Sequence, residues 1–160
     1  MILVLGLGNV LLSDEGAGVA AMNALKARLG ESERWCFLDG GTHSFALAGP
    51  IADCDALLVF DAAALDKVPG EIAVYQGEAM DAFITHRPKQ SVHEVGLMDL
   101  MSLARLGGHW PVRRALIGVR PQSLDWGSEP TPVVAAAIPR MCDAAENLMR
   151  TWMDSDVSGI

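Results

Sequence analysis

Hydrophobic and polar positions follow two different periods along this chain. Short apolar runs that suit strands are separated by longer segments whose apolar residues recur at helical spacing. The wholly apolar run at 56–60 is typical of a central strand that is buried on both faces. The predicted strands are 2–7, 34–38, 56–60, 71–76 and 114–119; the predicted helices are 15–29, 43–52, 93–106 and 132–153, with a kink or a division of the last one at Pro139.

This alternation predicts an α/β fold, a three-layer α/β/α sandwich built on a mostly parallel five-stranded sheet. The segment between Asp61 and 71–76 is too short for a crossover helix, so we expect 71–76 to be the one antiparallel strand. Residues 1–160 are expected to form a single domain with a frayed tail at 154–160. In such sheets, ligands bind beyond the carboxyl ends of the strands where the strand order reverses, commonly between strands 1 and 3.

The first turn of the chain begins like a dinucleotide-binding fold and then departs from it. Gly6 and Gly8 follow the first strand, but a pyrophosphate site would have a third glycine at position 11, which is Leu11. Asp14 and Glu15 come next, and an acidic loop at the head of a helix repels phosphate and suits a cation. A nucleotide-binding oxidoreductase is therefore the less favoured alternative.

Composition narrows the choice of partners. The 160 residues are 51% hydrophobic and 20% charged, which is ordinary for a globular domain, and the net charge of −8 argues against nucleic acid and anionic membranes as partners. The three scattered cysteines are typical of reduced thiols, most often small core residues. The start does not resemble a signal peptide, and no apolar run is long enough to span a bilayer, so we expect a cytoplasmic protein.

Three side chains are candidates for a shared site: Glu15, Asp61 and His93. Taken singly, each has an ordinary explanation: a glutamate at a helix start, an aspartate that caps a turn, and a surface histidine. Together, two carboxylates and an imidazole suit Ni²⁺, Zn²⁺ or Fe²⁺, and their spacing does not choose the metal.

Rival catalytic motifs are missing from the sequence. His93 begins an HExxH-like run that lacks its second histidine, and neither a GxSxG elbow nor a Walker A loop is present. A cysteine–histidine pair stays open, although each cysteine lies in or beside an apolar stretch.

The ordered motifs GLGNVLLSDEGAG, LDGGT, VFDA and SVHEVGL resemble those of the [NiFe]-hydrogenase maturation endopeptidases. The similarity extends from residue 2 to about 148 and includes GVRPQSLDWG. The resemblance implies a protease that removes a C-terminal peptide from the hydrogenase large-subunit precursor after nickel insertion, on a mixed five-stranded sheet. It also implies that Glu15, Asp61 and His93 bind the nickel, which the substrate carries.

The LDGGT motif contributes the second group of candidates. Asp39 either orders the following turn or, as the resemblance implies, acts near the scissile bond as base, water-positioning group or substrate contact. Gly40, Gly41 and Thr42 are candidates for binding the substrate peptide. Asn9 fits a turn role better than a role as a donor to substrate.

The predicted function is therefore a nickel-dependent processing endopeptidase with no nucleotide cofactor, acting as a monomer on a large-subunit precursor. Nickel either activates the reacting groups or serves only for docking while Asp39 assists hydrolysis. The main alternative is a non-enzymatic nickel-binding chaperone. Trp110, Trp126 and the loop 121–130 are either a docking surface or part of the core.

Overall fold

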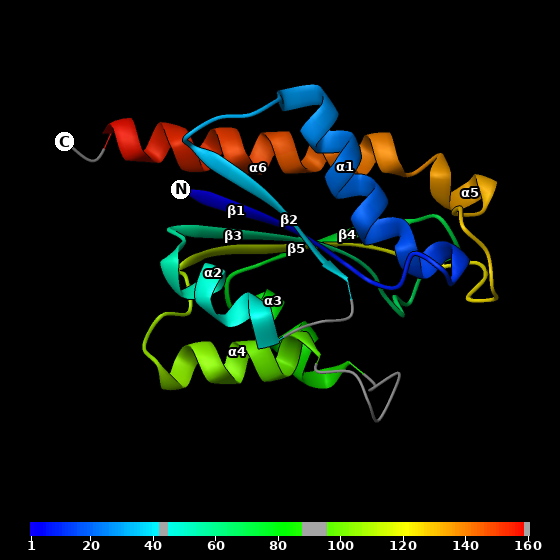
Figure 1. Cartoon of the computed structure of the whole chain (residues 1–160), viewed down its shortest axis with the longest axis horizontal. Coiled ribbons are helices and arrows are strands. Elements are labelled where there is room, and N and C mark those ends of the chain that lie inside the picture. The colour runs from blue at the N-terminus through cyan, green and yellow to red at the C-terminus, as the bar shows by residue number, and fades with distance from the viewer. Residues whose placement is uncertain (42–44, 88–95, 159–160) are drawn as a thin grey trace.

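The computed structural model describes residues 1–41, 45–87 and 96–158, which form a five-stranded sheet between two layers of helices (Figure 1). The strand order is β2-β1-β3-β5-β4, and only β4 runs antiparallel to its neighbour. The predicted fold class and the antiparallel fourth strand are thus confirmed. The strands are β1 (Ile2–Leu7), β2 (Trp35–Gly41), β3 (Ala56–Ala62), β4 (Ile72–Gln76) and β5 (Arg113–Val119).

The two helical layers follow from the alternation of side chains along the strands. Ile2 and Val4 of β1 belong to an apolar cluster with the helices of one face, whereas Leu3 and Leu5 belong to a second cluster on the other face. Figure 1 shows the long helix α6 and α1 on the first face and the three shorter helices α2 to α4 on the second. The helices are α1 (Ala17–Leu29), α2 (Ala48–Asp53), α3 (Glu78–His86), α4 (Leu97–Leu106), α5 (Pro132–Ala135) and α6 (Ile138–Ser158), with 3₁₀ turns η1 (Ser13–Gly16) and η2 (Phe45–Leu47).

Two expectations about the helices need correction, and a third, the division of the last helix, is confirmed. Helix α3 was not predicted, because the buried Asp81 interrupts the apolar stripe that Met80 and Ile84 would otherwise mark. The last helix divides between α5 and α6, ahead of Pro139, which lies in the first turn of α6 where a proline costs little. The tail is not frayed throughout, since α6 continues to Ser158 and Arg113 pairs with Asp156 at 2.6 Å.

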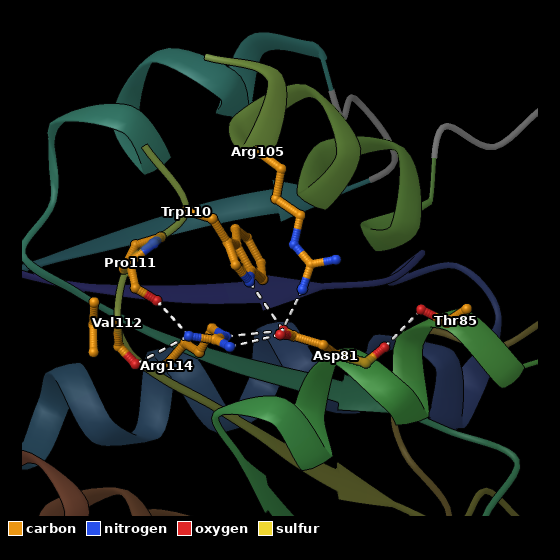
Figure 2. Close-up of polar contacts among 7 residues, drawn as sticks. All are labelled: Asp81, Thr85, Arg105, Trp110, Pro111, Val112 and Arg114. Atoms are coloured by element: carbon orange, nitrogen blue, oxygen red, sulfur yellow. Dashed lines mark hydrogen bonds and ion pairs between the residues drawn. The ribbon is translucent and has the colours of Figure 1, made fainter. Parts of the chain in front are cut away.

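Asp81 joins α3, α4 and β5 through a set of charged hydrogen bonds (Figure 2). Arg114 donates Nε to Oδ1 at 2.8 Å and Nη2 to Oδ2 at 2.6 Å, while Arg105 donates to Oδ2 at 2.7 Å and Trp110 to Oδ1 at 2.9 Å. Burial favours the neutral acid, but these donors outweigh it and hold the pKa of Asp81 below its ordinary value. The cluster therefore has a structural role: it holds α3, α4 and β5 together.

No helix within the described ranges has both the length and the apolar composition needed to cross a membrane.

Candidate functional site

The carboxyl ends of three neighbouring strands define the candidate site. Gly6 of β1 pairs with Asp39 of β2 on one side and with Phe60 of β3 on the other, so these strand ends are level across the sheet. The strand order reverses between β1 and β3, as predicted, and Asp61 follows Phe60 directly. Asp39 and Asp61 therefore lie at one edge, on strands about 10 Å apart because β1 runs between them.

Gly18 lets the start of α1 pack directly onto this edge. A Cβ at position 18 would lie 2.4 Å from the carbonyl oxygens of both Leu7 and Phe60. Leu7 is the last residue of β1, and Phe60 is the last residue of β3 that pairs with β1. No side chain fits there without displacing backbone. The close approach brings η1, the turn that carries Glu15, into contact with β3.

Asp61 is a buried carboxylate with a cationic partner. It lies on β3 with 6% of its surface exposed, and Arg87 at the end of α3 donates Nη1 to its Oδ2 at 2.8 Å. Arg87 also donates Nη2 to the carbonyl of Ala62 at 3.5 Å. Burial raises the pKa of the Asp61 carboxyl above its ordinary value, and the guanidinium of Arg87 opposes that rise.

Glu15 lies in η1, at the amino-terminal end of α1, where a carboxylate is favoured by the helix dipole. Its backbone N–H donates to the carbonyl of Leu12 at 3.0 Å, and its side chain is partly buried. The third predicted ligand, His93, lies outside the described residues, as does Thr42. Within the described residues, no three potential metal-ligating side chains are grouped closely enough to hold an ion, so the three-ligand set stays a prediction.

Asp14 has a structural role that the sequence did not reveal. It is fully buried and accepts the backbone N–H groups of Gln122, Ser123 and Thr131 at 2.6–2.9 Å, together with the Thr131 hydroxyl. Burial alone would raise the pKa of Asp14, but these hydrogen bonds lower it below the ordinary value. Asp14 thus fastens the loop after β5 to the turn before Glu15.

Asp39 and its glycines form the end of β2. Oδ1 of Asp39 accepts the backbone N–H of Gly41 at 2.8 Å, which is the turn role that the sequence offered. Gly40 is buried, and a Cβ there would lie 2.6 Å from Cδ2 of Leu7, so packing gives a sufficient reason for glycine. Gly41 has a φ of +46° and its carbonyl accepts the N–H of Gly8 at 3.2 Å. Catalysis by Asp39 and substrate binding by Gly40 and Gly41 stay predictions.

The cysteines are poorly placed for nucleophilic catalysis. Cys36 pairs with Leu3 near the amino ends of the strands, and Cys142 is buried in α6 against α1. Cys54 precedes β3, and burial raises its pKa to about 11. All three lie away from the carboxyl edge, which disfavours the cysteine–histidine alternative. Contrary to expectation, Cys36 is exposed rather than part of the core.

Two smaller predictions are now decided. Asn9 has the turn role, because its Oδ1 accepts the backbone N–H of Leu11 at 2.9 Å. Trp110 packs against the second apolar cluster, whereas Trp126 is 80% exposed, in the loop that Asp14 fastens. Arg87 was missed by sequence reasoning, although the buried strand-end Asp61, which needs a nearby positive charge, was an available signal.

These features define an α/β protein with an acidic site at the strand-order reversal of a mixed sheet. The chain belongs to the hydrogenase maturation protease family, whose model matches residues 19–148. It is therefore a peptidase that acts in hydrogenase maturation.

Relatives of known sequence and structure agree with this assignment. The hydrogenase 2 maturation protease of Escherichia coli K12 is 38% identical over 160 residues, covering 99% of this chain and 94% of that protein. The hydrogenase expression/formation protein HupD of Rhizobium leguminosarum bv. viciae is 38% identical over 152 residues, covering 94% and 75%. The structure of the hydrogenase maturating endopeptidase HybD from E. coli matches with a TM-score of 0.86 at 36% identity, covering 94% of this chain and 92% of that one.

Proposed function

We propose that this protease removes a C-terminal peptide from the nickel-loaded precursor of a [NiFe]-hydrogenase large subunit. In this proposal the nickel is part of the substrate, and Glu15, Asp61 and His93 bind it. The enzyme acts as a cytoplasmic monomer and uses no nucleotide cofactor. Metal recognition fixes the position of the precursor, so that only metal-loaded precursor is cleaved.

The observation that carries the proposal is the placement of Asp61. It is a buried carboxylate at the reversal point of the sheet, next to the turn that bears Glu15, in a member of the hydrogenase maturation proteases. A buried carboxylate in this position needs a positive charge nearby, and a divalent cation can supply it. His93 is 32 positions further along the chain and is proposed as the third ligand by its place in the SVHEVGL motif.

The chemistry of these donors fits a metal that arrives already bound elsewhere. Two carboxylates and an imidazole are hard to borderline ligands, and the proposed set contains no thiolate. Such a set binds a free ion weakly and completes the coordination of an ion that the precursor already holds. When bound there, nickel supplies positive charge near the peptide bond to be cleaved.

Asp39 is proposed to assist hydrolysis from the neighbouring strand. Its carboxylate is exposed at the same edge of the sheet, and one oxygen accepts the Gly41 N–H while the other can face a water molecule. A carboxylate at this position can accept a proton from the attacking water. Gly40, Gly41 and Thr42 are proposed to lie along the substrate peptide.

A histidine substitution tests the proposal. His93→Ala should abolish cleavage of nickel-loaded precursor, read as the mass of the large subunit, while the circular dichroism spectrum stays unchanged. His109→Ala is the matched control, because His109 is exposed in the turn after α4. Undiminished cleavage by a folded His93→Ala variant would remove the basis for metal recognition.

A further inference from the structure

The ion pair between Arg87 and Asp61 occupies the place that the proposed function gives to a metal. Nη1 of Arg87 lies 2.8 Å from Oδ2 of Asp61, and the two side chains are 21% and 9% exposed. Alternation along β3 turns Asp61 towards the face that carries α3, because Leu57 and Val59 belong to the apolar cluster on that face. Arg87 directly follows α3 and reaches Asp61 from there.

We propose that Arg87 is a displaceable counter-cation, which neutralises Asp61 in the isolated protease and leaves it when the substrate's metal arrives. This inference rests on the proposed function, since it requires Asp61 to bind that metal. In this role Arg87 disfavours a free metal ion relative to the metal that the precursor carries. Arg87 acts through Asp61 and is therefore a positioning residue.

The charges explain why the two cations compete for Asp61. A guanidinium and a divalent ion repel each other, so the Arg87 pair weakens binding of an ion at either oxygen of Asp61, and a tightly held ion in turn weakens the Arg87 pair. Loss of the ion pair leaves Asp61 uncompensated unless another cation replaces Arg87. Binding of a free ion must therefore overcome the existing pair, whereas a metal on the precursor brings further protein–protein contacts that offset this loss.

The geometry of the pair makes exchange feasible. Arg87 meets the carboxylate through a single nitrogen–oxygen contact, whereas Arg114 grips both oxygens of Asp81 with two nitrogens. Bidentate pairs are the stronger and more rigid arrangement, so the Asp61 pair is the weaker of the two. The backbone of Arg87 is extended, with φ −74° and ψ 137°, so the residue lies beyond the last turn of α3 and its side chain reaches back to the sheet.

Titration of the isolated protein with Ni²⁺ alone tests this inference. At pH 8, Arg87→Gln and Arg87→Met should bind Ni²⁺ about tenfold more tightly than the wild type, the size of effect that neighbouring groups have on metal sites. Arg140→Gln is the control for loss of one positive charge, because Arg140 contacts the Gly70 carbonyl from α6, on the face of the sheet opposite to α3 and Arg87. Equal or weaker Ni²⁺ binding by a folded Arg87 variant would overturn the proposal.

A measurement on the wild-type protein removes any dependence on the folding of the variants. In ¹⁵N-labelled protein titrated with diamagnetic Zn²⁺, the Arg87 side-chain resonances should shift towards those of a solvated arginine, and those of Arg114 should stay in place. Unchanged Arg87 resonances while Zn²⁺ saturates the site would also overturn the proposal.

Cleavage assays separate this inference from the proposed function. If the wild type cleaves only nickel-loaded precursor but the Arg87 variants bind Ni²⁺ no more tightly, the counter-cation role fails and the proposed function stands. If the wild type does not shorten nickel-loaded precursor, the proposed function fails, whatever the titrations give.

Discussion

Thr131 donates its backbone N–H to Oδ1 of Asp14 over 2.6 Å, although 117 positions separate the two residues along the chain. Together with Gln122 and Ser123, this contact makes one buried carboxylate the anchor of the whole loop between β5 and α5. The turn that carries Glu15 begins at the neighbouring Ser13, so the anchor also fixes the position of a proposed ligand.

We expect Asp14→Asn to lower the free energy of unfolding by about 3 kcal/mol, because an amide nitrogen would face backbone donors that now meet a carboxylate. The matched control is Asp125→Asn, which removes the same charge from an exposed side chain in the same loop. Urea denaturation of both variants measures the difference. Equal stability of the two variants would show that the anchor contributes little.

The same residue predicts a pH dependence. The folded-state pKa of Asp14 lies below the ordinary value of 3.8, so its stabilisation is fully present above that value and is lost as the pH falls through the folded-state pKa. The wild type should therefore lose more stability than Asp14→Asn as the pH falls from about 5 to about 3. Parallel stability curves for the two proteins in this range would contradict the assignment.

Gly18→Ala should disturb the site from within the fold. The added methyl group meets two strand carbonyls at 2.4 Å, so α1 must move away from the carboxyl edge, at a cost of about 1–3 kcal/mol. Gly49→Ala is the control, since a Cβ on Gly49 in α2 has nothing within 4 Å. The melting temperature and the cleavage rate should both fall for Gly18→Ala and stay unchanged for Gly49→Ala. A wild-type melting temperature for Gly18→Ala would contradict the close packing.

Removing one partner of the Asp81 cluster should affect stability without touching the proposed chemistry. Asp81→Ala leaves the Arg114 guanidinium, whose side chain is only 12% exposed, without its carboxylate partner and is expected to cost about 3–5 kcal/mol. Arg105→Gln should cost no more than about 1 kcal/mol, because the Arg105 side chain is 52% exposed. Urea titrations compare the two, and a larger loss for Arg105→Gln would reverse this order of importance.

Two substitutions at Asp39 separate its turn role from a catalytic one. Asparagine keeps an oxygen that accepts the Gly41 N–H at the observed 2.8 Å, but it cannot accept a proton from water. Asp39→Asn should therefore keep the wild-type melting temperature and lose at least about 100-fold in cleavage rate. Asp39→Ala should lower both the melting temperature and the cleavage rate. Near-normal cleavage by Asp39→Asn would show that Asp39 only orders the turn.

The strands and the reversal point could be predicted from the sequence because their signals are local. The run 56–60 is apolar at every position, and the short connection after Asp61 allows only an antiparallel return for β4. These features do not depend on what the rest of the chain does.

The parts that escaped prediction depend on partners distant in sequence. Helix α3 was missed because the arginines that justify the burial of its Asp81 lie 24 and 33 positions away in the sequence. Asp14 and Glu15 are adjacent acids with no difference in pattern, so the sequence does not show that Asp14 receives the loop 122–131. Arg87 is likewise 26 positions from Asp61 and belongs to a segment that reads as a polar loop.

Incubation of the purified protease with nickel-loaded and nickel-free large-subunit precursor, followed by mass spectrometry, tests the central claim most directly. We predict that the loaded precursor loses a C-terminal peptide and that the nickel-free precursor keeps its full mass. Cleavage of both forms at the same rate would contradict recognition through the substrate's nickel, and cleavage of neither would contradict the proposed substrate.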